Sequence, residues 1–300
     1  GYLLRNYVSH AIPCLGIEPT QATAQAARAL GIEVISAFFG AGLSEKIRLE
    51  YRPASLIIAN NVLAHVPDIN DFVLGISKLL ADDGVVSLEF PHLLNLLKEC
   101  QFDTIYHEHY SYLSLGTVQT ILQQVGLRVF DVEQLPTHGG SLRLWCCQQP
   151  AHYETSSRVA HVLALEADAG LTVPSTYRDF QLRVDTITAQ LTQFLLQCRQ
   201  ERKTVVAYGA AAKGNTLLNY AGIDSDLISV VFDAAKSKQG KFLPGSHIPI
   251  LSPDLLPAYK PDVVMILPWN IAAEVRSQLL QQHNTALTFV TAVPTLSISE

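Results

Sequence analysis

Short apolar runs rich in β-branched residues alternate along the chain with longer amphipathic stretches, a pattern typical of βαβ folds. In the first half of the chain, these runs predict strands at residues 33–35, 55–59, 85–90, 127–133 and 142–147. The amphipathic stretches predict helices at residues 2–8, 20–30, 68–80 and from about 115 to 126. Asp82, Asp83 and Gly84 predict a turn before the strand at 85–90.

The pattern changes near Pro150, because residues 151–200 are polar and helical and carry no strand signal. A second α/β unit follows, with a strand at 204–208, a loop of small residues at 209–214 and a helix to about 220. Its further elements are strands at 227–232, 263–267 and 287–290 and a helix at 271–281. We therefore predict two Rossmann-like α/β lobes with parallel-rich sheets, at residues 1–150 and 201–300, joined by a helical connector at 151–200.

Composition narrows the class of protein. The 300 residues are 48% hydrophobic and 16% charged, which favours a globular protein with a sizeable core. The net charge of −6 disfavours a nucleic-acid partner, and no apolar run approaches the roughly 18 residues that span a membrane. Five cysteines without a CxxC pair favour neither a zinc ribbon nor a disulfide framework. We expect a cytoplasmic protein.

The start of the chain is unusual for a doubly wound fold. Such a fold begins with a strand and a glycine turn ahead of its first helix, and neither precedes the helix expected at 2–8. The chain also opens without Met. We expect a truncated product or part of a longer protein.

The densest polar cluster is Tyr106-His107-Glu108-His109-Tyr110, followed by Ser111 and Tyr112. Histidine titrates near neutral pH and phenols donate to oxyanions, so the cluster suits proton abstraction beside a carbonyl. Its place beyond the carboxyl end of a strand is where open α/β sheets bind ligands. A solvated aromatic loop is an alternative. A metal site is another, although side chains two residues apart rarely converge on one ion.

Two further positions in the first lobe have both a functional and a structural interpretation. His65 closes the segment Asn60–His65 after the apolar strand, where histidine more often completes a turn than catalyses. Glu18 lies at the expected carboxyl end of a strand that leads into a helix. There an acidic residue either binds ribose hydroxyls or caps the helix.

The loop at 209–214 (GAAAKG) lies between a strand and a helix in the second lobe. Small residues let backbone amides approach an anion, and Lys213 adds a positive charge, which suits a phosphate or pyrophosphate. Tight packing of strand against helix explains the small residues equally well. The loop has neither the GxGxxG nor the GxxxxGK[ST] spacing. The residues that follow the next strand and are candidates to complete such a site are Asp233, Lys236, Lys238, Lys241 and His247, although loop lysines are more often simply solvated.

Five segments together resemble one known family, the S-adenosylmethionine-dependent sugar C-methyltransferases, which act on nucleotide-linked ketodeoxysugars. They are NNVLAHVP at 60–67, EFP at 89–91, FDTIYHEHYSYLS at 102–114, HGGSLR at 138–143 and YGAAAKGN at 208–215. The resemblance covers essentially the whole chain in order, and the YHEH and YGAAAKG segments are its most specific parts.

The resemblance implies a three-part enzyme with an amino-terminal zinc-binding segment, a central cofactor lobe and a carboxyl-terminal α/β lobe. This chain has no zinc-type cysteines, so zinc is expected only in a segment outside it, and no metal is expected in the chain itself. Of the first cofactor motif, only Gly1 and Tyr2 remain. The implied methyl donor is S-adenosylmethionine, and the implied cofactor-binding residues are Gly1, Tyr2, Glu18, Asn60 and Asn61.

The resemblance also assigns catalytic roles. His109 falls on the family's general base, Tyr106 and Glu108 are its partners, and His65 falls on a second catalytic histidine. The expected substrate-binding residues are His138, Arg143, Tyr208, Lys213, Asn215, Asp233 and Lys241. The implied reaction methylates a carbon next to a ketone of a nucleotide-linked deoxysugar through an enolate. A catalytically silent nucleotide- or nucleotide-sugar-binding protein is the main alternative, and the absence of GxGxxG and YxxxK weighs against an oxidoreductase or epimerase.

Overall fold

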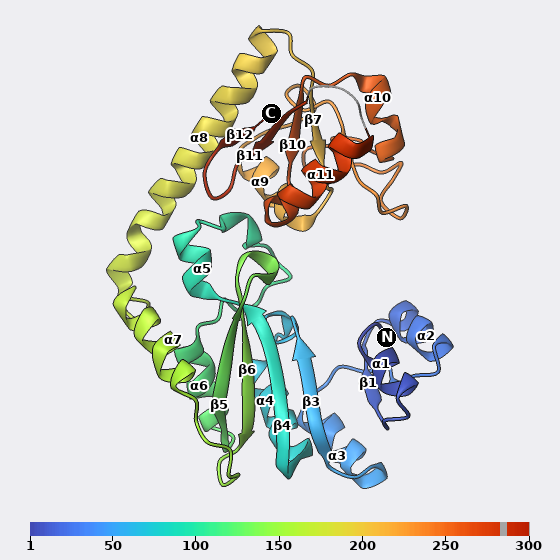
Figure 1. The fold of residues 1–300 in the computed structure, drawn as a ribbon, viewed down its shortest axis with the longest axis vertical. Coiled ribbons are helices and arrows are strands. Elements are labelled where there is room, and N and C mark those ends of the chain that lie inside the picture. The colour runs from blue at the N-terminus through green and yellow to red at the C-terminus, as the bar shows by residue number, and fades with distance from the viewer. Residues whose placement is uncertain (283–286, 300) are drawn as a thin grey trace. The chain divides into compact units, whose positions relative to one another are not determined.

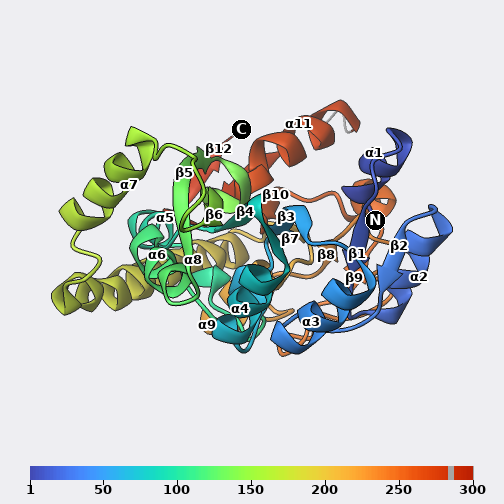
Figure 2. The same cartoon turned by 90° about the horizontal axis from the view of Figure 1, so that it is seen from below.

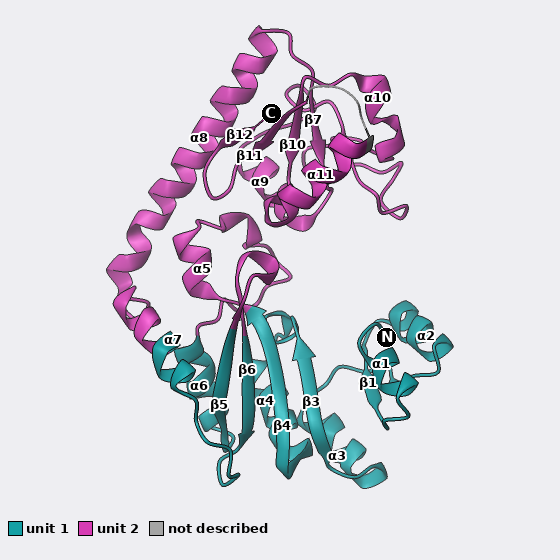
Figure 3. Ribbon diagram, in the orientation of Figure 1, with its two compact units in different colours: residues 1–90, 115–133, 143–162 teal, residues 91–114, 134–142, 163–300 magenta. Residues whose placement is uncertain are grey.

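A computed structural model describes residues 1–282 and 287–299 of the chain as a mixed α/β protein with parallel-rich sheets, which confirms the predicted fold class. The chain divides into two compact units (Figure 3). Unit 1 comprises residues 1–90, 115–133 and 143–162, and unit 2 comprises residues 91–114, 134–142 and 163–300. Among the described residues, no helix has both the length and the apolar character needed to cross a bilayer.

Unit 1 begins with a small βα layer. Strands β1 (Leu15–Ile17) and β2 (Glu33–Ile35) pair in parallel. Figure 2 shows α2 (Gln21–Ala29) beside them, and its small residues pack on the apolar side chains of the strand region: Ala24, Ala27, Ile32 and Val34. Gly31, at φ +77°, allows the chain to turn sharply after the helix. Helix α1 (Leu4–Ser9) precedes this layer, so the first three elements predicted from the sequence are confirmed.

A four-stranded sheet with the order β3-β4-β6-β5 follows. Its strands are β3 (Ala54–Asn60), β4 (Leu80–Pro91), β5 (Leu127–Leu135) and β6 (Ser141–Gln148). The helices that accompany it in the chain are α3 (Ala41–Glu50), α4 (Ile69–Leu79), α6 (Leu115–Gln123) and α7 (Ser157–Asp168). The turn predicted at residues 82–84 is wrong, because β4 runs through these residues and absorbs them at a shift in its register with β3.

Unit 2 contains a six-stranded sheet with the order β12-β11-β10-β7-β8-β9. Its strands are β7 (Val205–Tyr208), β8 (Val231–Phe232), β9 (Ile250–Leu251), β10 (Val263–Ile266), β11 (Thr288–Thr291) and β12 (Ser297–Ser299). All neighbours pair in parallel except β11 with β12. The strand predicted at 227–232 is reduced to its last two residues, because the amides of Asp226 and Leu227 bond back to Asp224 in a turn.

Side chains alternate between the two faces of this sheet, and helices cover both. Val205, Ala207 and Met265 face α8 (Arg178–Gln200) and α9 (Ala212–Tyr220), whereas Val206 and Val264 face α10 (Leu256–Tyr259) and α11 (Ala272–Gln282). Figure 1 shows the long helix α8 running along the sheet. The two-sided burial explains why these strands are continuously apolar.

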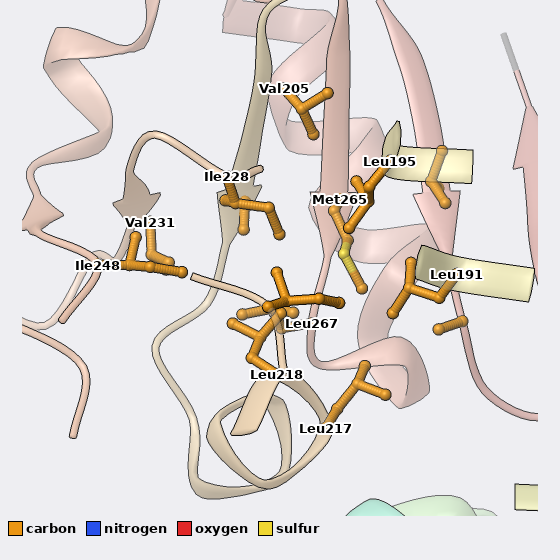
Figure 4. Packing of buried hydrophobic residues seen from close by; sticks show 14 of the residues in the cluster. Leu191, Leu195, Val205, Leu217, Leu218, Ile228, Val231, Ile248, Met265 and Leu267 are labelled. Atoms are coloured by element: carbon orange, nitrogen blue, oxygen red, sulfur yellow. The ribbon is translucent and has the colours of Figure 1, made fainter. Parts of the chain in front are cut away.

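Helix α8 is a core element of unit 2 as well as the second half of the helical segment predicted at 151–200. Leu191 and Leu195 are fully buried against Met265 and Leu267 (Figure 4). Unit 2 also holds α5 (Leu93–Lys98) and three short 3-10 turns that form part of the site described below: η2 (Phe102–Thr104), η3 (Thr137–Gly139) and η6 (Trp269–Ile271).

Candidate active site

The sheet of unit 2 has a topological switch point between β7 and β10. The chain passes from β7 to β8 on one side and later returns to β10 on the other. Loops that leave the carboxyl ends of two such strands diverge, and the crevice between them is where open α/β sheets bind ligands. Here they are the glycine loop at 209–211 and the segment that begins with Pro268 and Trp269. The loop predicted at 209–214 is too long, because α9 begins at Ala212 and includes Lys213 and Gly214.

Lys213, in the first turn of α9, contacts the segment after β10. Its Nζ donates to Oδ1 of Asn270 at 2.7 Å and lies 4.5 Å from the centroid of the Trp269 ring. Burial lowers the pKa of the ammonium, and the nearby carboxyl of Asp103 partly opposes that shift. Among the described residues, no carboxylate lies within ion-pair distance of Nζ. A cation held by a neutral amide and an aromatic face retains its attraction for an anionic ligand.

Close packing explains both Gly209, which opens the loop, and Gly214, which lies in the first turn of α9. Gly209 has φ +91°, and a Cβ there would lie 2.5 Å from the ring of Pro268. A Cβ at Gly214 would lie 2.6 Å from the side chain of Leu267. The alternative of tight strand–helix packing therefore holds for the glycines, and Lys213 carries the argument for an anion site.

The other substrate-binding candidates of this region have different surroundings. Asp233 braces the loop, because Oδ2 accepts from the amide of Ala210 at 2.7 Å and Oδ1 from the amide of Ala235 at 2.8 Å. Tyr208 is buried in β7, and Lys241 is exposed. Oδ1 of Asn215 is buried and has no hydrogen-bond partner among the described residues. Direct substrate contact by these four residues stays a prediction.

Asp103 and Trp269 form a contact that the sequence analysis missed. Asp103 lies in η2 and is fully buried, and its Oδ2 accepts from Nε1 of Trp269 at 2.7 Å. Burial raises the pKa of this carboxyl to about 6, against the opposing effects of the indole bond and of Lys213. The sequence held one signal for Trp269, a Pro-Trp-Asn segment directly after an apolar strand, but none for its partner.

This carboxyl makes stability depend on pH. The pKa of Asp103 is about 6 in the folded state and 3.8 for an unperturbed aspartate, so the folded protein binds more protons between these values and gains stability as pH falls. We expect the free energy of unfolding to rise, through this group, by about 1 kcal/mol between pH 7 and pH 5. Urea unfolding of wild type and Asp103→Asn at both pH values measures it. An equal pH dependence in the two proteins would contradict the shifted pKa.

His109 lies in the turn after η2 with a fixed ring orientation. Its Nδ1 lies 2.8 Å from the carbonyl oxygen of Thr104. A carbonyl only accepts, so Nδ1 carries a proton. In the neutral form of a ring with this tautomer, the lone pair is on Nε2. The ring of Tyr106 stacks on the imidazole at 4.4 Å, and the ring of Tyr112 meets it edge-on at 6.1 Å. The imidazole of His109 is thus in contact with the rings of both Tyr106 and Tyr112.

The pKa values of both phenols are raised above the ordinary value for tyrosine. Burial raises the pKa of Tyr106, and the carboxylates of Glu108 and Asp103 raise it further. Burial likewise raises the pKa of Tyr112. Glu108 is exposed and lies in the same turn as His109. The group can therefore accept one proton at His109 and donate hydrogen bonds from the tyrosines.

His138 lies in η3 with φ +57°, and its side chain is exposed. The next residue, Gly139, packs so closely on the indole of Trp269 that a Cβ there would collide with it. The carbonyl of Gly139 accepts from Nε2 of Gln101 at 2.7 Å. The η3 loop is thus attached to the same tryptophan as Lys213.

The cofactor-binding candidates and two others lie in unit 1. Glu18 directly follows β1, and its Oε1 accepts from the amide of Thr20 at 2.8 Å. Asn60 ends β3, and Asn61, at φ +53°, donates its amide to the carbonyl of Glu89 at 2.7 Å. His65 ends the turn η1 (Leu63–His65) and is half-buried. Gly1 and Tyr2 are exposed.

Arg143 is engaged by two carboxylates of unit 1. It donates to the buried Glu89 at 2.8 Å and to Glu133 at 3.5 Å. Glu133 also accepts from the indole of Trp145 at 2.9 Å. The two carboxylates already pair with the guanidinium of Arg143. A role for Arg143 in substrate binding stays a prediction.

No group of three or more His, Cys, Asp or Glu residues that could hold a metal ion occurs within residues 1–282 and 287–299.

The predicted site residues are distributed over both units. Unit 1 holds Gly1, Tyr2, Glu18, Asn60, Asn61, His65 and Arg143. Unit 2 holds Tyr106, Glu108, His109, His138, Tyr208, Lys213, Asn215, Asp233 and Lys241.

Comparison with known proteins identifies the family. Residues 136–294, more than half of the chain, match the C-methyltransferase C-terminal domain. The chain belongs to the C-methyltransferase family. Residues 1–132 match a methyltransferase domain. The family membership expected from the sequence motifs is thereby confirmed.

The chain is also similar to individual proteins. It is 39% identical over 261 residues to C-methyltransferase NovU of Streptomyces niveus, which covers 87% of this chain. The chain spans 62% of the length of that relative. Among solved structures, an S-adenosylmethionine-dependent methyltransferase from Mesorhizobium loti matches with a TM-score of 0.38 and 15% identity, covering 49% of this chain and 85% of its own. N-methyltransferase NodS from Bradyrhizobium japonicum, in complex with S-adenosyl-L-homocysteine, matches with a TM-score of 0.32 and 15% identity, covering 45% and 65%.

The C-methyltransferase family is S-adenosylmethionine-dependent, and the residues of unit 1 fit that cofactor. Glu18 places a carboxylate at the carboxyl end of a parallel strand, the position at which Rossmann-type folds accept hydrogen bonds from ribose hydroxyls. The Thr20 amide holds this carboxylate at the strand end. Asn60 and Asn61 provide amides at the carboxyl end of β3.

Proposed function

We propose that the full-length protein transfers the methyl group of S-adenosylmethionine to a carbon next to a ketone of a nucleotide-linked deoxysugar. The observation that carries this proposal is the geometry of His109. Its ring is oriented through Nδ1 by the Thr104 carbonyl and flanked by two phenols. That arrangement suits formation of an enolate, which is the nucleophile that a C-methylation beside a ketone requires.

Each of these residues has its own proposed role in the proton transfer. Nε2 of His109 removes the proton from the carbon beside the ketone, and the electron pair moves onto the ketone oxygen. Tyr106 and Tyr112 donate hydrogen bonds to that oxygen, since phenols are protonated at neutral pH and burial raises the pKa of both further. The Thr104 carbonyl stabilises the imidazolium that results, and Glu108 adds a negative charge in the same turn. His65 is proposed as a second catalytic histidine.

S-adenosylmethionine supplies a methyl group that its sulfonium centre already activates for displacement. Glu18 is proposed to accept hydrogen bonds from its ribose, with Asn60 and Asn61 as further contacts. Gly1 and Tyr2 are proposed to belong to the same site. Holding the methyl donor and the enolate in line supplies much of the acceleration of methyl transfer, because the two reactants no longer have to meet by diffusion.

The carboxyl-terminal lobe, residues 201–300, is proposed to bind the nucleotide sugar through its diphosphate at Lys213. We expect Lys213→Met to weaken binding of thymidine diphosphate by about tenfold to a hundredfold, because a hydrogen bond to a charged group is lost. Calorimetry with the full-length protein measures this. Lys260→Met, which removes an exposed lysine of the same unit, is the matched control and should bind as wild type does. Equal weakening in both variants would contradict a specific diphosphate contact.

The proposed partner is therefore a small nucleotide-linked sugar, and the proposed place of action is the cytoplasm. The acidic balance of 27 Asp and Glu against 21 Lys and Arg supports a partner other than nucleic acid.

The test uses the full-length protein, S-adenosylmethionine and a thymidine diphosphate-linked 4-keto-6-deoxysugar. We expect mass spectrometry to show a product heavier by one methyl group in place of one hydrogen, on carbon rather than oxygen. Binding of thymidine diphosphate without any methylated product would favour the silent nucleotide-binding protein instead.

A further inference from the structure

The turn η2 carries two neighbouring contacts with different partners. The carbonyl of Thr104 orients His109 by accepting from Nδ1 at 2.8 Å. The carboxylate of Asp103, one residue earlier, accepts from Nε1 of Trp269 at 2.7 Å. Consecutive residues of one tight turn move together, so the Asp103 bond also fixes the Thr104 carbonyl.

The turn η2 is anchored in the core of unit 2. Phe102 is buried in the cluster formed by α8, α9 and the sheet, and its ring meets that of Tyr220 edge-on at 5.6 Å. Helix α9 ends at Tyr220 and carries Lys213 in its first turn. The proposed base and the proposed diphosphate ligand are thus mounted on one packed body.

Three other residues of unit 2 contact the side chain of Trp269. Lys213 lies over its ring, Asp103 accepts its N–H, and Gly139 packs against its six-membered edge. Asp103 is fully buried, and its other oxygen has no hydrogen-bond partner among the described residues. The indole N–H is therefore the contact through which this carboxyl acts on its surroundings.

On the basis of the function proposed above, we infer that Asp103 and Trp269 are positioning residues whose hydrogen bond sets the place of His109 relative to Lys213. The diphosphate at Lys213 fixes one end of the substrate, and His109 must meet the carbon beside the ketone at the other end. Neither Asp103 nor Trp269 has to touch the reacting atoms. Loss of their bond lets η2 shift, and a misplacement of about 1 Å can cost about a hundredfold in rate.

The test compares four variants of the full-length protein: Trp269→Phe, Asp103→Leu, Asp103→Asn and the control Tyr177→Phe. The control removes an exposed side-chain hydrogen bond to the Leu171 carbonyl in the same unit. Two quantities are measured. One is kcat for deuterium exchange beside the ketone of a thymidine diphosphate-linked 4-keto-6-deoxysugar in heavy water. The other is the Kd for thymidine diphosphate.

We expect Trp269→Phe and Asp103→Leu to lower kcat for exchange by about tenfold to a hundredfold. Their Kd for thymidine diphosphate should stay within about threefold of wild type, because Lys213 and Asn270 remain. Asp103→Asn should restore most of kcat, since its amide oxygen still accepts from the indole. A merely structural role would neither separate kcat from Kd nor be rescued by asparagine.

The inference is overturned if Trp269→Phe keeps wild-type kcat, or if Asp103→Asn falls as far as Asp103→Leu. Absence of exchange in wild type would instead refute the proposed function. In that case, NMR titration of the His109 ring in wild type and Trp269→Phe still decides the positioning. A changed titration supports it, and an unchanged one overturns it. If Asp103→Leu does not fold, the Trp269→Phe results stand alone.

Discussion

Replacing His109 with asparagine is expected to lower the rate of methyl transfer by about a hundredfold to ten-thousandfold, the contribution of a general base. The asparagine amide can still donate to the Thr104 carbonyl, as Nδ1 does in the wild type. The variant therefore preserves the turn and removes only the lone pair of Nε2. Single-turnover kinetics with saturating S-adenosylmethionine and ketosugar measures the step without a contribution from product release.

His107→Asn is the matched control, because His107 is an exposed histidine two residues away in the same turn. It should react at the wild-type rate. The assignment of the base would be wrong if His109→Asn kept wild-type activity, or if His107→Asn lost as much. Unchanged Kd values for both substrates in His109→Asn would show that binding had been left intact.

Substituting Gly209 with alanine is expected to lower the free energy of unfolding by about 2–4 kcal/mol, the range of strain plus overpacking in a core. Two effects add at this position. The backbone at φ +91° disfavours any residue with a Cβ, and that Cβ would lie 2.5 Å from Cδ of Pro268. A rigid proline ring cannot swing away, so the loop or the segment after β10 must shift.

Gly222→Ala separates these two effects. Gly222 has φ +65° in the same unit, and a Cβ there would have no atom within 4 Å. It should cost about 1 kcal/mol, the backbone effect alone. Urea unfolding of both variants gives the comparison. Equal losses would show that contact with Pro268 contributes nothing.

Much of the fold could be predicted because local pattern fixes it. Strands β7 and β10 are apolar along their length since helices cover both faces, and Gly31 and Gly126 end helices at positive φ. Strands β9 and β12, of two and three residues, were missed because so short a run has no readable period. They exist through pairing with neighbours already in place.

The sequence analysis predicts that the α8 segment is helical but not that this helix packs in the core of unit 2. Its polar composition predicts a helical connector, whereas its apolar side chains recur at helical spacing as a buried stripe at Val184, Ile187, Leu191, Leu195 and Cys198. That spacing is the signal of a core helix. The buried stripe packs α8 against the sheet of the second lobe.

The candidate site likewise has one part that the sequence predicts and one part that it does not. The aromatic turn with His109 could be found because its chemistry is concentrated in adjacent residues. The contact between Asp103 and Trp269 could not, since 166 positions separate them and only the folded sheet brings η2 to the carboxyl end of β10. A single aspartate after a phenylalanine resembles any polar residue in a turn.

Methylation beside a ketone, as proposed here, begins when His109 removes a proton from the carbon next to that ketone. The full-length protein, incubated in heavy water with the nucleotide-linked ketosugar and no methyl donor, tests this step by itself. We expect NMR to show deuterium at one carbon next to the ketone with the wild type and none with His109→Asn. Deuterium incorporation at the same rate in both proteins, or in neither, would contradict it.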